Sequence, residues 1–403
     1  MNQGDTAWML VASALVLFMT PGLAFFYGGL VRGKNVVNTI MLSFMAMAVV
    51  SVVWVLWGYS LAFGTGNWFI GDFSALGFRG VDMNGGTGPI PDMLFAIFQM
   101  MFAIITPALI TGAVVERFKF TTYLVFLVLW ITFVYAPIAH WVWAPEGWLF
   151  KRGALDFAGG TVVHINAAVA AVVAALLLGK RRNPGLEPHN VPFVMLGVGI
   201  LWFGWFGFNA GSGLAANGLA VNAFLVTNTA AAAAALTWGV LSHLQNKRMS
   251  AVGVGSGAVA GLVAITPAAG FVGVMGALAI GFGAGALCYI AVRLRPKTGI
   301  DDSLDVFGVH GVGGIWGALA AGIFAAAAIG GKEGLIEGNI GQMGTQIIGI
   351  VATLLYSAVI TFIILKVLDV IPSLGLRVSE RQEEQSVDVT AHGERAYVSD
   401  GAD

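Results

Sequence analysis

Charged residues are scarce in this chain, and their scarcity excludes most soluble folds. Only 10% of its 403 residues are Asp, Glu, Lys or Arg, whereas soluble domains average about 25%. The formal net charge is −1 and there is no basic arm, so nothing indicates nucleic-acid binding. Cysteine is almost absent too. The single Cys288 excludes intrachain disulfides and cysteine-rich metal sites, and its apolar surroundings predict a small packing residue.

Apolar residues and glycine take the place of the missing charges. Apolar residues make up 58% of the chain, and its 56 glycines are roughly twice ordinary usage. With so few charges, the glycines indicate helices that pack closely through small faces rather than flexible loops. The composition therefore predicts an all-α polytopic membrane protein surrounded by lipid.

Eleven apolar segments are long enough to cross a bilayer, which takes about 20 residues. The weakest break between them is a turn from Pro267 to Gly273. Residues 1–371 are predicted to form the transmembrane domain, and residues 372–403 a polar, mostly acidic tail. The predicted spans are 7–31, 36–63, 92–115, 121–143, 158–179, 192–214, 219–244, 251–270, 271–292, 306–329 and 342–370.

Lys and Arg alternate between rich and poor connections. The connections that follow the first, third, fifth, seventh and ninth spans hold twelve Lys and Arg residues. The remaining connections hold only Arg79, Lys151, Arg152 and Lys332. The positive-inside rule therefore predicts the N-terminus outside and the C-terminus in the cytoplasm, which requires an odd number of spans. The first span is not predicted to be a cleavable signal, because it lacks a basic n-region. With no soluble catalytic domain, the protein is predicted not to be an enzyme.

Two histidines lie inside apolar, glycine-rich runs. His164 is in D-F-A-G-G-T-V-V-H-I-N-A-A and His310 in D-V-F-G-V-H-G-V-G-G-I-W-G. Ionisable groups in such surroundings are costly, and by default they mark the path of an ion, proton or substrate. Burial favours neutral imidazoles, which donate from one nitrogen and accept at the other. The pair could relay a proton or bind a small amine; the alternative is two packing histidines.

The histidines fall in the fifth and tenth spans, which would be equivalent helices in an inverted five-helix repeat followed by a final helix. Asp156 and Asp305 precede them, and each is predicted to cap its helix. Asp156 could also place negative charge where a cation arrives. Each histidine lies only five or six residues inside its predicted helix, near opposite membrane faces. The rings could meet only if both helices begin inside the membrane.

Aromatic residues near the span ends could hold a small cation. Ring faces together with a hydroxyl bind cations through cation–π contacts and a hydrogen bond. Packing in the core or in an interfacial belt is the alternative for each aromatic alone. His140, at the outer end of the fourth span, is predicted to be interfacial rather than a ligand. The candidates are Phe102, Trp143, Trp205, Phe208 and Ser212.

Five stretches resemble the ammonium transporter (Amt/Mep/Rh) family, in order along essentially the whole chain. The chain is similar to bacterial Amt-type members rather than Rh proteins. The stretches are F-F-Y-G-G-L-V-R-G-K-N at 25–35, D-F-A-G-G-T-V-V-H-I-N-A at 156–167, G-W-F-G-F-N-A-G-S at 204–212, D-V-F-G-V-H-G-V-G-G-I-W-G at 305–317 and V-D-V-T-A-H-G-E-R-A-Y at 387–397.

The resemblance implies transport of ammonium or ammonia, with methylammonium as an analogue, across the inner (plasma) membrane. It implies a homotrimer with one pore in each subunit and no cofactor or metal. The tail resembles those that meet PII-type regulatory proteins at the cytoplasmic face. Two other functions stay open from the residues alone. One is an ammonium sensor that signals through the tail, and the other is a redox protein whose paired histidines ligate b-type haem.

The resemblance also implies roles for single residues. Asp156 would support ammonium binding and deprotonation. His164 and His310 would be twin histidines lining the pore near its middle, which favours helices that begin inside the membrane. The other implied positions are Trp143, Ser212 and Phe102 in the outer recruitment site, Phe102 and Phe208 stacked as a gate, Trp205 further along the pore, and Phe26 and Tyr27 at the cytoplasmic exit.

Overall fold

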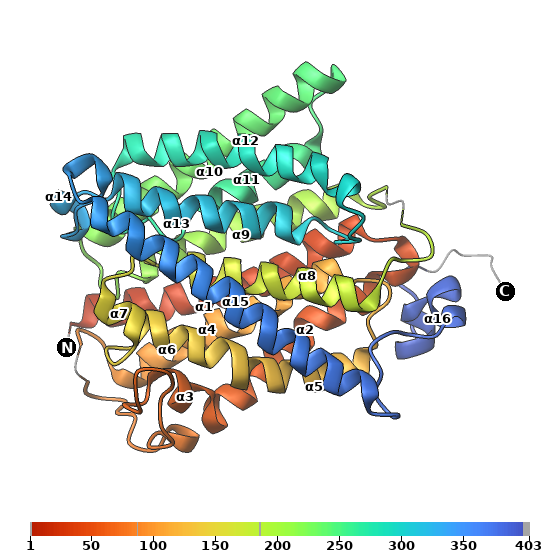
Figure 1. Cartoon of the computed structure of the whole chain (residues 1–403), viewed down its shortest axis with the longest axis horizontal. Helices are drawn as coiled ribbons and strands as arrows, with labels where there is room; N and C mark the ends of the chain where they lie inside the picture. The colour runs from red at the N-terminus through yellow and green to blue at the C-terminus, as the bar shows by residue number, and fades with distance from the viewer. Residues whose placement is uncertain (1, 87, 185–186, 398–403) are drawn as a thin grey trace.

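The computed structural model describes residues 2–86, 88–184 and 187–397. Over these ranges the regular structure is helical, and the only β-type pairing is an isolated bridge between Phe118 and Arg377. Most long helices lie side by side in one bundle (Figure 1). The chain enters α1 (Gln3–Leu30) at one end of this bundle, and α16 (Glu380–Gln385) lies at the opposite end (Figure 1).

The first half of the bundle contains five apolar helical segments, most of which change helix type along their length. After α1 and the turn η1 (Gly33–Asn35), the segments are α2 (Val36–Val53) with η2 (Trp54–Gly58) and α3 (Tyr59–Phe63); α4 (Asp92–Ile110) with η4 (Thr111–Ala113); α5 (Phe120–Trp130) with η5 (Ile131–Tyr135) and α6 (Ala136–Trp143); and η6 (Gly160–Ile165) with α8 (Asn166–Leu178). Short η3 (Leu76–Phe78) and α7 (Trp148–Arg152) lie in the connections.

The second half also contains five such segments and ends with one additional helix. Its elements are α9 (Val191–Gly211), α10 (Gly218–Asn246), α11 (Ala251–Ile265), α12 (Val274–Thr298), η7 (Phe307–Gly311) with α13 (Val312–Phe324), short α14 (Ala327–Gly330) and η8 (Leu335–Glu337), and finally α15 (Ile340–Val370).

Each predicted span contains a helix, but their count as membrane crossings is not confirmed. Among the described residues, ten helices are long and apolar enough to cross a bilayer. The eighth predicted span is α11, whose 15 residues reach only about 22 Å, against a hydrocarbon thickness of about 30 Å. α11 ends at Ile265 because the chain enters the turn that the sequence placed between Pro267 and Gly273.

Glycines allow α1 and α9, the first helices of the two halves, to pack at close range. A Cβ atom added to Gly22 of α1 would lie 2.6 Å from Ile200 Cγ2, and one added to Gly207 of α9 would lie 2.7 Å from Leu15 Cβ. Both contacts are too short for any larger residue. The prediction that glycine serves helix packing is therefore confirmed at this interface. Cys288 is likewise a buried free thiol, whose Sγ–H donates to Val309 O at 3.8 Å.

The tail lies against the loops at one end of the bundle. Asp388, in η9 (Asp388–His392), accepts hydrogen bonds from the backbone N–H groups of Val37 at 2.9 Å and Asn38 at 2.7 Å, at the start of α2. Arg377 donates to Leu178 O at the end of α8 and pairs with Glu383 at 2.7 Å. The tail thus contacts the ends of α2 and α8.

His140, at the end of α6, is buried and lies against two backbone carbonyl groups. Its Nδ1 lies 3.0 Å from Ala62 O and its Nε2 lies 2.6 Å from Asn67 O. These carbonyls belong to the end of α3 and the connection that follows it. This connection folds back over the end of α6 and covers the ring, so His140 holds a loop in place.

Candidate functional site

Three cavities follow one another through the bundle and contain most of the predicted site residues. An outer pocket of about 220 Å³ is lined by Phe102, Trp143 and Ser212, among others. A central cavity of about 10 Å³ is lined by His164 and His310 together with apolar side chains. A third cavity, of about 230 Å³, shares His310 and Phe26 with the central one. Together they outline a path with a very narrow middle.

The outer pocket combines aromatic faces with one oriented hydroxyl group. The Phe102 and Trp143 rings meet edge to face, with centroids 5.8 Å apart. Trp143 donates its indole N–H to Asp156 O at 2.9 Å, which fixes the ring. Ser212 donates to Phe208 O at 2.9 Å, so its lone pairs remain free to accept from a ligand N–H. Such a pocket can hold a small cation.

Two phenylalanine rings in tilted contact lie between the outer pocket and the central cavity. The Phe102 and Phe208 ring centroids lie 4.3 Å apart with a 38° interplanar angle, and each residue is only 1% exposed. The family resemblance implies that these rings meet, and the structure places them in contact with their planes tilted. One of these rings lines the outer pocket and the other lines the central cavity.

The two candidate histidines touch each other in the central cavity. His164 Nδ1 lies 3.2 Å from His310 Nδ1, and the rings lie 5.3 Å apart with a 23° interplanar angle. In a neutral pair, one Nδ1 must donate and the other accept, so the two rings adopt opposite tautomers. Within the described chain, His164 Nε2 has no hydrogen-bond partner although it is buried. The pair therefore presents polar nitrogen atoms to an otherwise apolar passage.

The histidines meet because both of their helices begin in the interior of the bundle. Asp156, 6% exposed, accepts four backbone N–H bonds at the start of η6: from Gly159 at 2.9 Å, Gly160 at 2.6 Å, Thr161 at 2.8 Å and Val162 at 3.1 Å. These donors are the orphan amides of the first turn, which the carboxylate satisfies. The predicted cap at Asp156 is confirmed, and buried helix starts are the arrangement that lets the two rings touch.

The predicted cap at Asp305 is wrong, because Asp302 occupies that role. Asp302 accepts from Val306 N at 3.0 Å and Phe307 N at 2.7 Å, whereas Asp305 pairs with Arg295. Asp305 has a φ of 59°, a left-handed backbone conformation that turns the chain just before the helix starts. Asp302 lies eight residues before His310, just as Asp156 lies eight before His164. This shared spacing is the sequence signal that could have identified Asp302 as the cap.

Asp302 should therefore matter more to stability than Asp305. In Asp302→Ala, two amides at the start of η7 lose their acceptor, and loss of a cap costs about 1–2 kcal/mol. Asp305→Ala removes a partly exposed ion pair, worth about 0–1 kcal/mol. Thermal melting in detergent checks the order. Equal melting temperatures for the two variants would contradict the assignment.

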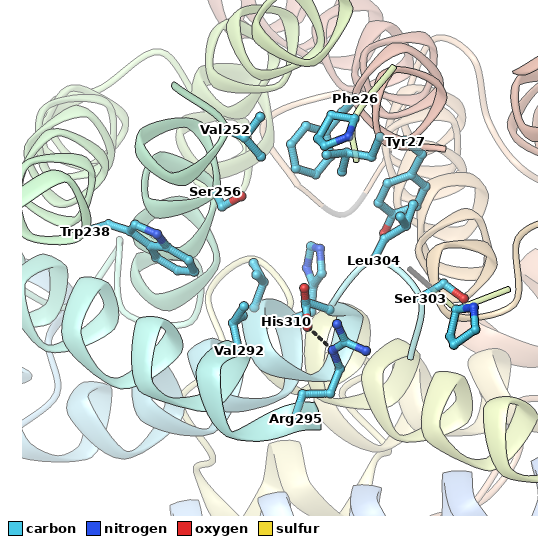
Figure 2. Close-up of a pocket in the computed structure, with 15 residues that line it drawn as sticks. Phe26, Tyr27, Trp238, Val252, Ser256, Val292, Arg295, Ser303, Leu304 and His310 are labelled. Carbon is cyan, nitrogen blue, oxygen red and sulfur yellow. Dashed lines mark hydrogen bonds and ion pairs between the residues drawn. The ribbon is translucent and has the colours of Figure 1, made fainter. Parts of the chain in front are cut away.

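The third cavity is lined in part by the connection between α8 and α9 and by the connection between α12 and η7. Figure 2 shows Phe26 and Tyr27 on one side of it, with His310 and Arg295 also in its lining. Tyr27 donates to Leu109 O at 3.1 Å, and its ring lies 5.8 Å from that of Phe26. Burial raises the pKa of Asp305 to about 6, and Arg295 opposes the rise. At neutral pH the carboxylate is therefore mostly ionised and paired with Arg295.

Every predicted site residue lines one of the three cavities, except Asp156, which caps the helix that carries His164. Sequence reasoning missed Asp302, Arg295 and Thr266, whose hydroxyl contacts Trp205 at 2.8 Å. The last two carried no sequence signal, since each acts through a contact with a different segment. Among the described residues, no group of three or more His, Cys, Asp or Glu side chains could hold a metal ion.

Comparison with known proteins gives one consistent family. The family model described as Ammonium Transporter Family matches residues 7–397. A curated ammonium transporter from Aquifex aeolicus is 53% identical over 402 residues, covering 98% of this chain and 94% of that protein.

Solved structures with the same fold include Mep2 and a sensor. The crystal structure of Saccharomyces cerevisiae Mep2 has a TM-score of 0.90 and 42% identity, covering 95% of this chain and 90% of that one. A structure described as a Sensor Amt Protein has a TM-score of 0.88 and 30% identity, covering 96% of this chain and 98% of that one.

Proposed function

The chain belongs to the ammonium transporter family and is a multi-pass membrane protein that transports ammonium, and we propose that it does so by recruiting the cation outside and conducting neutral ammonia past twin histidines. Trp143, Ser212 and Phe102 form the recruitment site. Phe102 and Phe208 form the gate, and Trp205 lines the passage beside His164 and His310. Phe26 and Tyr27 line the cytoplasmic exit. Asp156 supports ammonium binding and its deprotonation.

The observation that carries this proposal is the size and chemistry of the central cavity. Its volume of about 10 Å³ is near the minimum that admits one water molecule. Moving a bare ammonium-sized ion into such a low dielectric costs about 20 kcal/mol in the idealised limit. Potassium pays a similar cost because it is nearly the same size. Only ammonium can lose its charge by giving up a proton, so a dry passage selects for it.

The histidine contact supports a role in conduction. The two Nδ1 atoms form a hydrogen bond with each other, so both Nε2 atoms remain available to the passing solute or its proton. One Nε2 is an acceptor and the other a donor, because the tautomers are opposite. Ammonia can donate to the first and accept from the second as it moves between them.

The geometry favours transport over the redox alternative. A haem held between the two rings would need a gap far larger than one water molecule, whereas the two Nδ1 atoms lie 3.2 Å apart. The sensor alternative keeps the same pore residues, and one structural neighbour is described as a sensor. The curated relative from Aquifex aeolicus, which is more similar in sequence, is named a transporter, and this favours transport.

The architecture is also part of this proposal. We propose eleven spans in an inverted five-helix repeat plus a final helix, with the N-terminus outside the inner (plasma) membrane. The start of α1 and the tail helix α16 lie at opposite ends of the bundle, which supports an odd number of crossings. The matched pairs Asp156–His164 and Asp302–His310 support the repeat. The homotrimer, and a PII-type protein that binds the cytoplasmic face beside the tail (residues 372–403), remain predictions from the family resemblance.

Uptake by purified protein in liposomes tests the transport function. Proteoliposomes should accumulate labelled methylammonium faster than protein-free liposomes, and excess ammonium should compete with this uptake. An inert purified protein that still binds methylammonium would instead support the sensor. A Soret band would support the redox reading.

A further inference from the structure

We infer that Thr266 is a positioning residue for the pore: its hydroxyl group binds the indole N–H of Trp205 and keeps that donor out of the passage. This inference rests on the proposed conduction of ammonia past His164 and His310. Thr266 is the first residue after α11, at the turn that shortens this helix.

The hydroxyl of Thr266 is held in one orientation. Thr266 is 0% exposed, and it donates its O–H to Leu262 O at 2.8 Å. The oxygen lone pairs are then available to accept Trp205 Nε1–H, also at 2.8 Å. A hydroxyl carries one proton, so the donation to Leu262 leaves Thr266 only an acceptor towards the indole.

Trp205 needs this acceptor because its ring lies against the histidine pair. The indole lies 5.5 Å from the His164 ring with an interplanar angle of only 20°, and it also lines the central cavity with Phe208. Indole has a single polar group, the Nε1–H donor. With that donor engaged by Thr266, Trp205 offers the cavity only its apolar surface, and polar contacts are left to the imidazoles.

The turn that carries Thr266 is itself fixed to the helix start that positions His164. The next residue, Pro267, accepts Phe157 N–H at 3.1 Å through its carbonyl oxygen. A Cβ atom added to Gly160 would lie 2.5 Å from Pro267 Cγ, so the two segments pack without space between them. The same turn therefore contacts Trp205 through Thr266 and packs against the start of η6, the segment that contains His164.

Losing the hydroxyl should expose the passage to an unpaired donor. In Thr266→Val, which keeps the branched shape, the buried indole N–H has no acceptor, and an unsatisfied buried donor is costly. The freed N–H belongs to a ring that lines the central cavity beside His164. Binding of ammonia to this donor would retard each passage, while the outer recruitment pocket stays unchanged.

The experiment compares initial methylammonium uptake by proteoliposomes that contain equal amounts of folded protein. Thr266→Val should lower the maximal rate about tenfold, the equivalent of about 1.4 kcal/mol, with little change in half-saturating concentration. Thr266→Ser, which keeps the hydroxyl, should restore the rate to near wild type. Thr227→Val is the matched control: Thr227 is also 0% exposed, and it accepts from Asn209 and donates to Ala223 O away from the cavity.

A double-mutant cycle with Trp205→Phe shows whether Thr266 acts through the indole. The phenyl ring introduced by Trp205→Phe carries no N–H, so adding Thr266→Val should then cause no further loss. A wild-type rate for Thr266→Val, an equal loss in Thr227→Val, or a full additional loss in the Trp205→Phe background would each overturn the inference. Failure of the wild-type protein to take up methylammonium would instead remove the proposed function.

Discussion

Replacing Asp156 with alanine is expected to abolish methylammonium uptake. The carboxylate accepts four backbone N–H bonds at the start of η6 and is 6% exposed. Alanine would leave these buried amides without their acceptor, and loss of a helix cap costs about 1–2 kcal/mol. It would also remove the negative charge proposed to attract the cation beside Trp143, whose indole is bonded to the Asp156 carbonyl. Initial uptake rates in proteoliposomes measure the loss.

A second substitution separates the capping role from the charge. Asp156→Ser keeps an oxygen that can cap the helix but removes the negative charge. We expect it to be more stable than Asp156→Ala yet equally inactive, because a neutral cap cannot stabilise an arriving cation. Robust uptake by folded Asp156→Ser would limit Asp156 to a structural role, and robust uptake by Asp156→Ala would exclude both roles.

Replacing His164 and His310 together with leucine should change transport without unfolding the protein. Leucine is apolar and close to imidazole in volume, so the cavity stays filled, while the side-chain hydrogen bond removed is the one that the rings make with each other. We expect methylammonium flux to change at least about tenfold, which corresponds to about 1.4 kcal/mol, or potassium to be admitted. Gel filtration checks that the assembly is retained.

His140 provides the matched control for the histidine pair. It is also buried, but both of its ring nitrogens face carbonyl groups of α3 and the connection after it. His140→Leu should therefore lower stability with no change in ion selectivity. Normal methylammonium uptake together with normal potassium exclusion in the His164/His310 double variant would show that the pair serves packing alone.

Much of this fold could be predicted from the sequence because bilayer physics leaves few choices. Long apolar runs located a helix in every predicted span, and even the weak break at Pro267 was observed. Helix α11 is shorter than the predicted span because it ends at a turn inside the bundle. Composition does not reveal how deep such a turn lies, so the sequence could not show that this helix is short.

The candidate site was predictable where a residue type is costly in its surroundings. A histidine within an apolar run is unusual, and so His164 and His310 were found; their contact depended on where η6 and η7 begin. Asp305 was predicted as the cap, yet the observed cap is Asp302, which reaches forward four residues to Val306. Thr266 gave no signal because threonine is ordinary, and its partner Trp205 is 61 residues away.

One flux comparison tests the central claim most directly. Proteoliposomes that hold the wild-type protein are given equal outward gradients of potassium or of ammonium, and the flux of each ion is recorded against protein-free liposomes. If the narrow cavity beside the two imidazoles passes only what can shed a proton, ammonium should leave rapidly and potassium should stay at the protein-free rate. Potassium flux comparable to that of ammonium would contradict the account.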